Sequence, residues 1–235
     1  MSSKSEKTIA KTIANAEKLH EFVDLFTDYV PENPEESLAN YNLLITTAND
    51  SNHREANALS AYTKAVADRR KLFFRDADSL EKRYSDINQA IIRQYKEGSI
   101  EYKQVSSMIA KFRNSSRPKK DPAKPNAEHN SQSQKSFDSL AKGLFDLVGT
   151  IEGFSSPFVP INARVTIATL TTLYDDLIQA TKQVNITTYN HGSILSVRNK
   201  DLDKLRATGK AIKKAVAGQY GKASDKYLSI KGIAL

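Results

Sequence analysis

The stretch that decides the fold lies near the end of the chain, where residues 219–230 read QYGKASDKYLSI. Residues 94–105, which lie 125 positions earlier, read QYKEGSIEYKQV. The glutamine, one serine and two tyrosines fall at the same places in both stretches, and Val105 corresponds to Ile230. This agreement predicts that the chain contains two related segments.

A second match lies upstream of each stretch. Residues 30–33 read VPEN and residues 159–162 read VPIN, at an offset of 129. The two offsets differ by four residues, which one gap accounts for. We therefore expect an old tandem duplication, with a first helical unit at residues 1–112, a flexible basic linker at 113–135 and a second helical unit at 136–235.

Apolar residues recur every three or four positions through most of the chain, which is the period of one helix face. In the first segment this pattern begins at Ile9 and stops at Pro31. Asn33 and Pro34 then form a strong helix start, because asparagine accepts hydrogen bonds from free amide groups and proline fits the first turn. No stretch alternates like a strand beside a hairpin turn. The sequence predicts an all-α fold in which two antiparallel helical units form a bundle with long central helices.

The central helices are expected over residues 38–73 and 167–202, where the apolar stripe is preserved at an offset of 129. Residues 49–52 (NDSN) suggest a kink or break in the first of them. Third helices are expected at about 79–96 and 203–218, with the four extra residues of the first unit near residues 74–77. A short segment should follow each third helix, docked through structural tyrosines, which are Tyr95, Tyr102, Tyr220 and Tyr227.

The composition limits the classes of protein that need to be considered. The chain has 235 residues, of which 39% are hydrophobic, and it has no cysteine, which excludes disulfides, thiol nucleophiles and cysteine-ligated metals. The first residues are not followed by the apolar run of a secretory signal, and no apolar stretch approaches the ~20 residues of a membrane span. We expect a soluble, cytoplasmic protein that does not insert into a membrane.

The formal net charge of +8 is unevenly distributed. Residues 113–135 carry six basic and two acidic side chains, and residues 198–235 carry ten basic and three acidic ones. Such asymmetry can attract nucleic acid or another polyanion, although a solvated linker and helix face explain it more simply. The candidate polyanion-binding residues are Lys119, Lys120, Lys124, Arg206, Lys210, Lys213 and Lys214.

The chemically reactive residue types do not form a known motif. Glu17 and His20 have a spacing found in di-iron bundles, but the corresponding segment at residues 137–153 has no histidine. The acids around Asp78 lack the glycine and the spacing of a calcium loop and are typical of a helix N-terminus. No Walker loop, nucleophile elbow or zinc-protease motif is present. We therefore predict no cofactor, no metal and no enzymatic activity.

Two arginines lie on the otherwise apolar stripe, Arg69 in the first segment and Arg198 at the corresponding position of the second. A buried arginine needs a carboxylate or carbonyl partner, so these residues could mark an anion or partner site. The simpler interpretation is that each lies at the margin of the core and extends its charged end into water.

Residues 196–202 (SVRNKDL) and 220–227 (YGKASDKY), with the apolar terminus that follows, resemble a family of uncharacterised helical proteins from Bacteroidetes bacteria. The resemblance implies a bacterial, all-helical, non-enzymatic protein and assigns no functional residue. Together these observations favour a structural scaffold that binds another protein or itself, with polyanion binding as the alternative.

Overall fold

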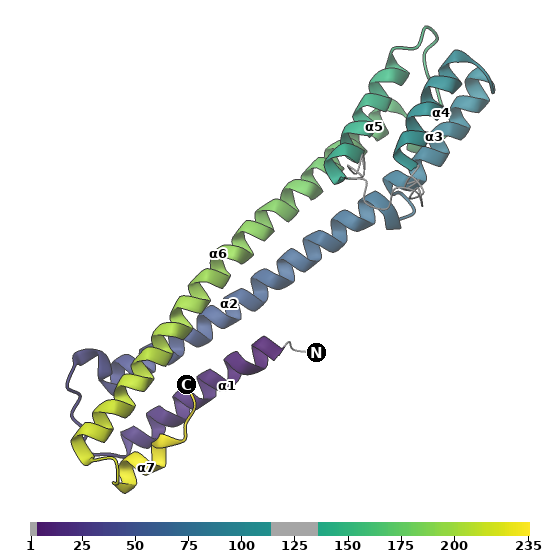
Figure 1. Ribbon diagram of the computed structural model, residues 1–235. Coiled ribbons are helices and arrows are strands. Elements are labelled where there is room, and N and C mark those ends of the chain that lie inside the picture. Colours follow the sequence, from purple (N-terminus) through teal and green to yellow (C-terminus); the bar gives the residue numbers. More distant parts are fainter. Residues whose placement is uncertain (1–3, 114–135) are drawn as a thin grey trace, which may run out of the picture. The chain divides into compact units, whose positions relative to one another are not determined.

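The computed structural model describes residues 4–113 and 136–235, and within them every regular element is a helix (Figure 1). The predicted all-α fold is confirmed for these residues. The predicted linker at 113–135 lies, apart from the last helical residue Arg113, outside them. The elements are α1 (Lys4–Asp24), η1 (Pro34–Glu36), α2 (Leu38–Arg70), η2 (Lys71–Arg75), α3 (Leu80–Tyr95), α4 (Ile100–Arg113), α5 (Phe137–Glu152), η3 (Ala163–Val165), α6 (Ile167–Tyr220) and α7 (Asp225–Lys231).

Helix α2 is continuous through residues 49–52, so the suggested break there is wrong. The polar side chains of this stretch find partners in the helical conformation. The hydroxyl of Ser51 donates to the carbonyl oxygen of Ala48 (3.1 Å), and Asn49 Nδ2 donates to Glu17 Oε1 on α1 (3.4 Å). Because these polar side chains are hydrogen-bonded in the helical conformation, they do not favour a turn at residues 49–52.

The second segment has no separate third helix, because α6 runs without interruption for 54 residues. In the first segment the corresponding path is interrupted after α2. There η2 is a short π-helix and a turn at residues 76–79 precedes α3. The interruption includes residues 74–77, where the sequence predicts the four extra residues of the first half.

The described chain divides into two compact units, each with its own apolar core. Unit 1 comprises residues 1–61 and 188–235, and unit 2 comprises residues 62–187. The predicted units, residues 1–112 and 136–235, are not the compact ones. The reason is that α2 and α6 each contribute residues to both units. Below, residues 1–112 are called the first half and residues 136–235 the second half.

Each core combines helices from both halves. In unit 1, Leu19 of α1 and Tyr41 of α2 are buried with Leu205 of α6. In unit 2, Ile87 of α3 is buried with Leu144 of α5. Burying one such side chain fully contributes about 1.5–3 kcal/mol, so neither half can form the observed cores without the other.

In each unit a glutamine near the end of a helix of one half holds a loop of the other half. In unit 1, Gln219 Nε2 donates to the carbonyl oxygen of Asp28 (2.6 Å), and its Oε1 accepts from the amide of Val30 (3.1 Å). In unit 2, Gln94 makes the same pair of bonds to Pro157 (2.6 Å) and Val159 (2.9 Å). The two glutamines are among the residues that match in the sequence.

The turns that follow these glutamines also agree. Lys96 has φ 70° and Gly221 has φ 85°, and glycine adopts this left-handed conformation at the lower cost. Three residues later, Ser99 Oγ accepts from the amide of Tyr102 (3.0 Å), as Ser224 Oγ does from Tyr227 (3.2 Å). The serines therefore cap α4 and α7 in the same way.

The predicted structural tyrosines pack inside their units. Tyr95 meets Phe154 edge-on with ring centroids 5.3 Å apart, and its hydroxyl donates to the carbonyl oxygen of Ser156 (2.7 Å). Tyr220 meets Phe26 edge-on at 6.1 Å. Tyr102 and Tyr227 pack against the cores of units 2 and 1 respectively. These contacts agree with a docking role.

Candidate functional site

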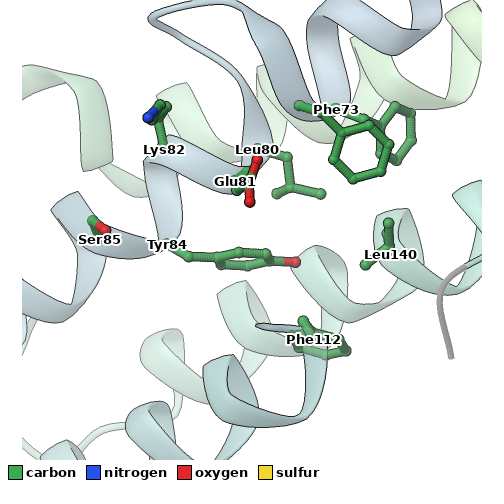
Figure 2. A pocket seen from close by; sticks show the side chains of 9 residues that line it. Phe73, Leu80, Glu81, Lys82, Tyr84, Ser85, Phe112 and Leu140 are labelled. Carbon is green, nitrogen blue, oxygen red and sulfur yellow. The ribbon is translucent and has the colours of Figure 1, made fainter. Parts of the chain in front are cut away.

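A cavity in unit 2 has a volume of about 510 Å³. Figure 2 shows Phe73, Leu80 and Leu140 around the hydroxyl end of Tyr84, whereas Lys82 and Ser85 lie toward the other side. The pocket is lined by Phe73, Phe74, Leu80, Glu81, Lys82, Tyr84, Ser85, Phe112 and Leu140.

The π-helix η2 and the start of α3 position the first of these residues. The turn buries Phe73 fully and leaves Phe74 39% exposed. Phe73 therefore packs in the core, while part of the Phe74 ring lies at the surface of the pocket. The buried Ser79 then begins α3, and its carbonyl oxygen accepts from the amide of Arg83 (3.0 Å). Leu80 and Tyr84, four residues apart, consequently face the same side of α3.

Aromatic rings form two groups at this pocket. Phe137 of α5 meets Phe73 edge-on with centroids 4.8 Å apart, and the guanidinium of Arg69 lies 3.8 Å from the centre of the same Phe137 ring. On the other side, Tyr84 stacks on Phe112 with centroids 5.7 Å apart and 15° between the planes. Gly143 makes this second group possible, because a β-carbon at that position would overlap the ring of Phe112.

An ion-pair cluster holds the start of α3 to η3, the short helix before α6. Asp78 Oδ1 accepts from Arg83 Nη2 (3.0 Å) and from Arg164 Nη2 (2.5 Å), and the latter nitrogen also donates to the carbonyl oxygen of Ala77 (2.6 Å). Burial, and then the charge of Arg164, lower the pKa of Arg83. The sequence predicts Asp78 as an acid typical of a helix N-terminus. In the structure it also bridges two arginines.

The two arginines of the apolar stripe have different environments. Arg198 is buried in unit 1, where its Nη1 donates to Glu55 Oε2 (2.7 Å), and Glu55 Oε1 lies 2.9 Å from His191 Nε2. Both Arg198 and Glu55 have side chains less than a tenth exposed. Arg69 is half-buried against Phe137 instead. The predicted need for a carboxylate is thus met at Arg198, and the sequence alone did not identify Glu55 as the partner.

The candidate polyanion-binding residues are only partly described. Lys119, Lys120 and Lys124 lie outside the described residues. Arg206 is half-buried and pairs with Asp203 (3.2 Å). The remaining three residues lie in the last third of α6, where Lys210 and Lys214 are exposed and Lys213 is half-buried.

Lys213 is occupied by the end of the chain. Its amine donates to the carbonyl oxygens of Lys231 and Ile233, both at 2.9 Å, and burial lowers its pKa. Its side chain therefore fastens the residues after α7 to α6. The predicted role of Lys213 in polyanion binding would compete with these bonds.

The Lys213→Met substitution should release the C-terminal residues. Losing hydrogen bonds from a charged donor costs about 1.5–3 kcal/mol, which corresponds to roughly tenfold or greater acceleration of amide hydrogen exchange after Tyr227. Hydrogen exchange read by mass spectrometry measures this effect. Lys214→Met is the matched control, since Lys214 is the exposed neighbour, and equal exchange in both variants would contradict the assigned role.

Among the described residues, no three histidine, aspartate and glutamate side chains come together in a way that could hold a metal ion. None of the described helices is long and apolar enough to cross a bilayer.

No protein-family model, no curated protein and no solved structure matches this chain. The resemblance to helical proteins of Bacteroidetes therefore stays a prediction. What can be said of the site rests on its own residues.

Proposed function

We propose that the protein is a non-enzymatic helical scaffold that binds another protein, and that the pocket of unit 2 receives an apolar side chain of that partner. The observation that carries the proposal is the lining, in which aromatic rings at positions 73, 74, 84 and 112 stand beside the polar side chains of Glu81, Lys82 and Ser85. The volume of about 510 Å³ lies within the range of ligand sites, and buried apolar anchors supply most of the affinity at protein interfaces.

The proposal predicts that the pocket binds N-acetyl-leucine amide, a minimal aliphatic probe. When the probe is added to protein with isotopically labelled phenylalanine rings, we expect the NMR signals of Phe74 and Phe112 to shift. The shifts should saturate at millimolar concentrations of the probe, because a ligand with few atoms binds weakly. Phe74→Asp should abolish the saturation, because it places a charge on the exposed part of the lining.

Phe145→Asp is the matched control for this titration. Phe145 also belongs to unit 2 and is 57% exposed, but its ring contacts Tyr174 and does not line the pocket. The probe should bind this variant as it binds the parent protein. Shifts that never saturate, or an equal loss in both variants, would overturn the proposed binding site.

We also propose that the two halves arose by tandem duplication. Support comes from the matching glutamine bonds, from the matching serine caps and from the positive φ at Lys96 and Gly221. These contacts recur at the offsets of 125 and 129 that the sequence predicts. A scaffold role is consistent with such a history, since a duplicated helical unit preserves packing surfaces.

Polyanion binding is the second candidate function. It is favoured by Lys210 and Lys214, which lie one turn apart on an exposed part of α6 and form no ion pair with another described residue. Phosphate groups need only such exposed cations, and their binding weakens steeply with salt. This surface belongs to unit 1, so it does not depend on the pocket of unit 2.

A further inference from the structure

Corresponding positions in the two halves carry residues of different size, and the differences are matched within each unit. In unit 1, Tyr41 of the first half lies against Gly209 of the second, where a β-carbon would be only 2.5 Å from the tyrosine hydroxyl. Position 41 corresponds to Leu170 and position 209 to Tyr84, and these two share the core of unit 2. The position that carries tyrosine in unit 1 therefore carries leucine in unit 2, and the position that carries glycine in unit 1 carries tyrosine in unit 2.

Charge is matched in the same way. In unit 1, Glu55 of the first half binds Arg198 of the second at 2.7 Å. The corresponding positions in unit 2 are Val184 and Arg69, at the offset of 129. There the arginine lies against the ring of Phe137.

These differences disfavour pairing of like halves. Two first halves would place Tyr41 opposite Tyr84, although even a β-carbon is already too close to Tyr41 at that position. Two second halves would place Leu170 opposite Gly209, which leaves a void, and Val184 opposite Arg198, which leaves a buried charge without its carboxylate. Overpacking, cavities and unpaired charges are the repulsive elements that give interfaces their specificity.

We propose that the first and second halves recognise each other as a heterotypic pair, and that Tyr41, Glu55, Arg198 and Gly209 determine this specificity. The inference rests on the proposed duplication, since it needs the correspondence of positions between halves. Each half therefore binds the other half, either in its own chain or in a second copy of the protein.

The first test cuts the chain between its halves. A protease recognition sequence is placed within residues 114–135 of the full chain, and the folded protein is cleaved, unfolded in urea and refolded by dilution. Size-exclusion chromatography with light scattering should recover both fragments in one species and in equal amounts. Separate fragments, or complexes of like halves, would overturn the proposal.

The second test removes the element that excludes first-half pairs. Tyr84→Gly gives a first half in which glycine faces Tyr41 and Arg69 faces Glu55, so both pairings of unit 1 become available between two copies. After cleavage and refolding, first-half pairs should rise at least about tenfold over the parent, a change worth ~1.4 kcal/mol. Tyr41→Leu offers a second route, because it recreates the combination of leucine and tyrosine that the core of unit 2 contains at these positions.

Phe112→Ala is the matched control. It removes the ring that stacks on Tyr84 at 5.7 Å but leaves Tyr84 opposite Tyr41, so first-half pairs should not increase. If neither Tyr84→Gly nor Tyr41→Leu raises the share of first-half pairs, the correspondence of positions is wrong and the proposal fails. That failure would leave binding of N-acetyl-leucine amide to the uncut protein unaffected, so the two proposals fail independently.

Discussion

Replacing Glu55 with leucine is expected to lower the free energy of unfolding by about 3–5 kcal/mol, because it leaves a buried arginine without its carboxylate. The Arg198 side chain is only 9% exposed and donates to Glu55 over 2.7 Å. Its Nε already has no hydrogen-bond partner among the described residues. The unpaired guanidinium would have to stay desolvated or open the core of unit 1 to water. Urea unfolding followed by far-UV circular dichroism measures the loss.

The double substitution Glu55→Leu and Arg198→Met separates the cost of the unpaired charge from the contribution of the pair. Buried ion pairs can often be replaced by apolar residues with little loss, so the double variant should recover most of the parent stability. Asp68→Leu is the control on the same helix, since it breaks the ion pair to Lys64, whose side chain is 78% exposed. It should leave the urea midpoint nearly unchanged. A double variant as unstable as Glu55→Leu would show that the charge is not the cause.

The local signals in the sequence located the starts of short helices but not every capping bond. Asn33 and Pro34 lie at the start of η1, yet the Asn33 side chain accepts no capping hydrogen bond there. The corresponding Asn162 Oδ1 does accept from the amide of Arg164 (3.0 Å) at the start of η3. Capping and proline effects act within one turn, so a single sequence is sufficient to find them.

The course of the long helices was predicted less well. The analogy with the first half predicts that one helix ends and another begins near residue 203, yet α6 continues to Tyr220. Between Val197 and Gly209 the second half has no proline or glycine, and it lacks the four extra residues that accompany the interruption at η2. Without these breakers the helical pattern extends.

The composition of the compact units could not be predicted from the sequence. A periodic stripe shows that a helix has an apolar face, but it does not say which helix covers that face. The pairing of Glu55 with Arg198 joins residues 143 positions apart, and the pocket draws on η2, α3, α4 and α5. Such contacts depend on how the halves combine, which is information that a single chain's periodicity does not contain.

Replacing Gly209 with tyrosine is expected to destabilise unit 1 by about 1–3 kcal/mol, because it inserts a whole side chain into a closely packed position. The first added atom would overlap Leu235 and would lie 2.5 Å from the hydroxyl of Tyr41. Tyr41 is fully buried, and its hydroxyl has no hydrogen-bond partner among the described residues. Thermal unfolding monitored by circular dichroism, with hydrogen exchange to locate the loss in unit 1, measures the effect.

Adding Tyr41→Leu to this variant should restore part of the lost stability, since it removes the hydroxyl that lies 2.5 Å from the added β-carbon and leaves only the overlap with Leu235. The control is Gly192→Tyr in the same helix, where no atom lies within 4 Å of an added β-carbon. That substitution should be neutral or slightly stabilising, because glycine costs about 0.5–1 kcal/mol inside a helix. If Gly209→Tyr were as stable as Gly192→Tyr, the close packing of Tyr41 on α6 would be wrong. If the double variant gained nothing, positions 41 and 209 would not be equivalent to positions 170 and 84, and the size exchange that distinguishes the two halves would lose its physical basis.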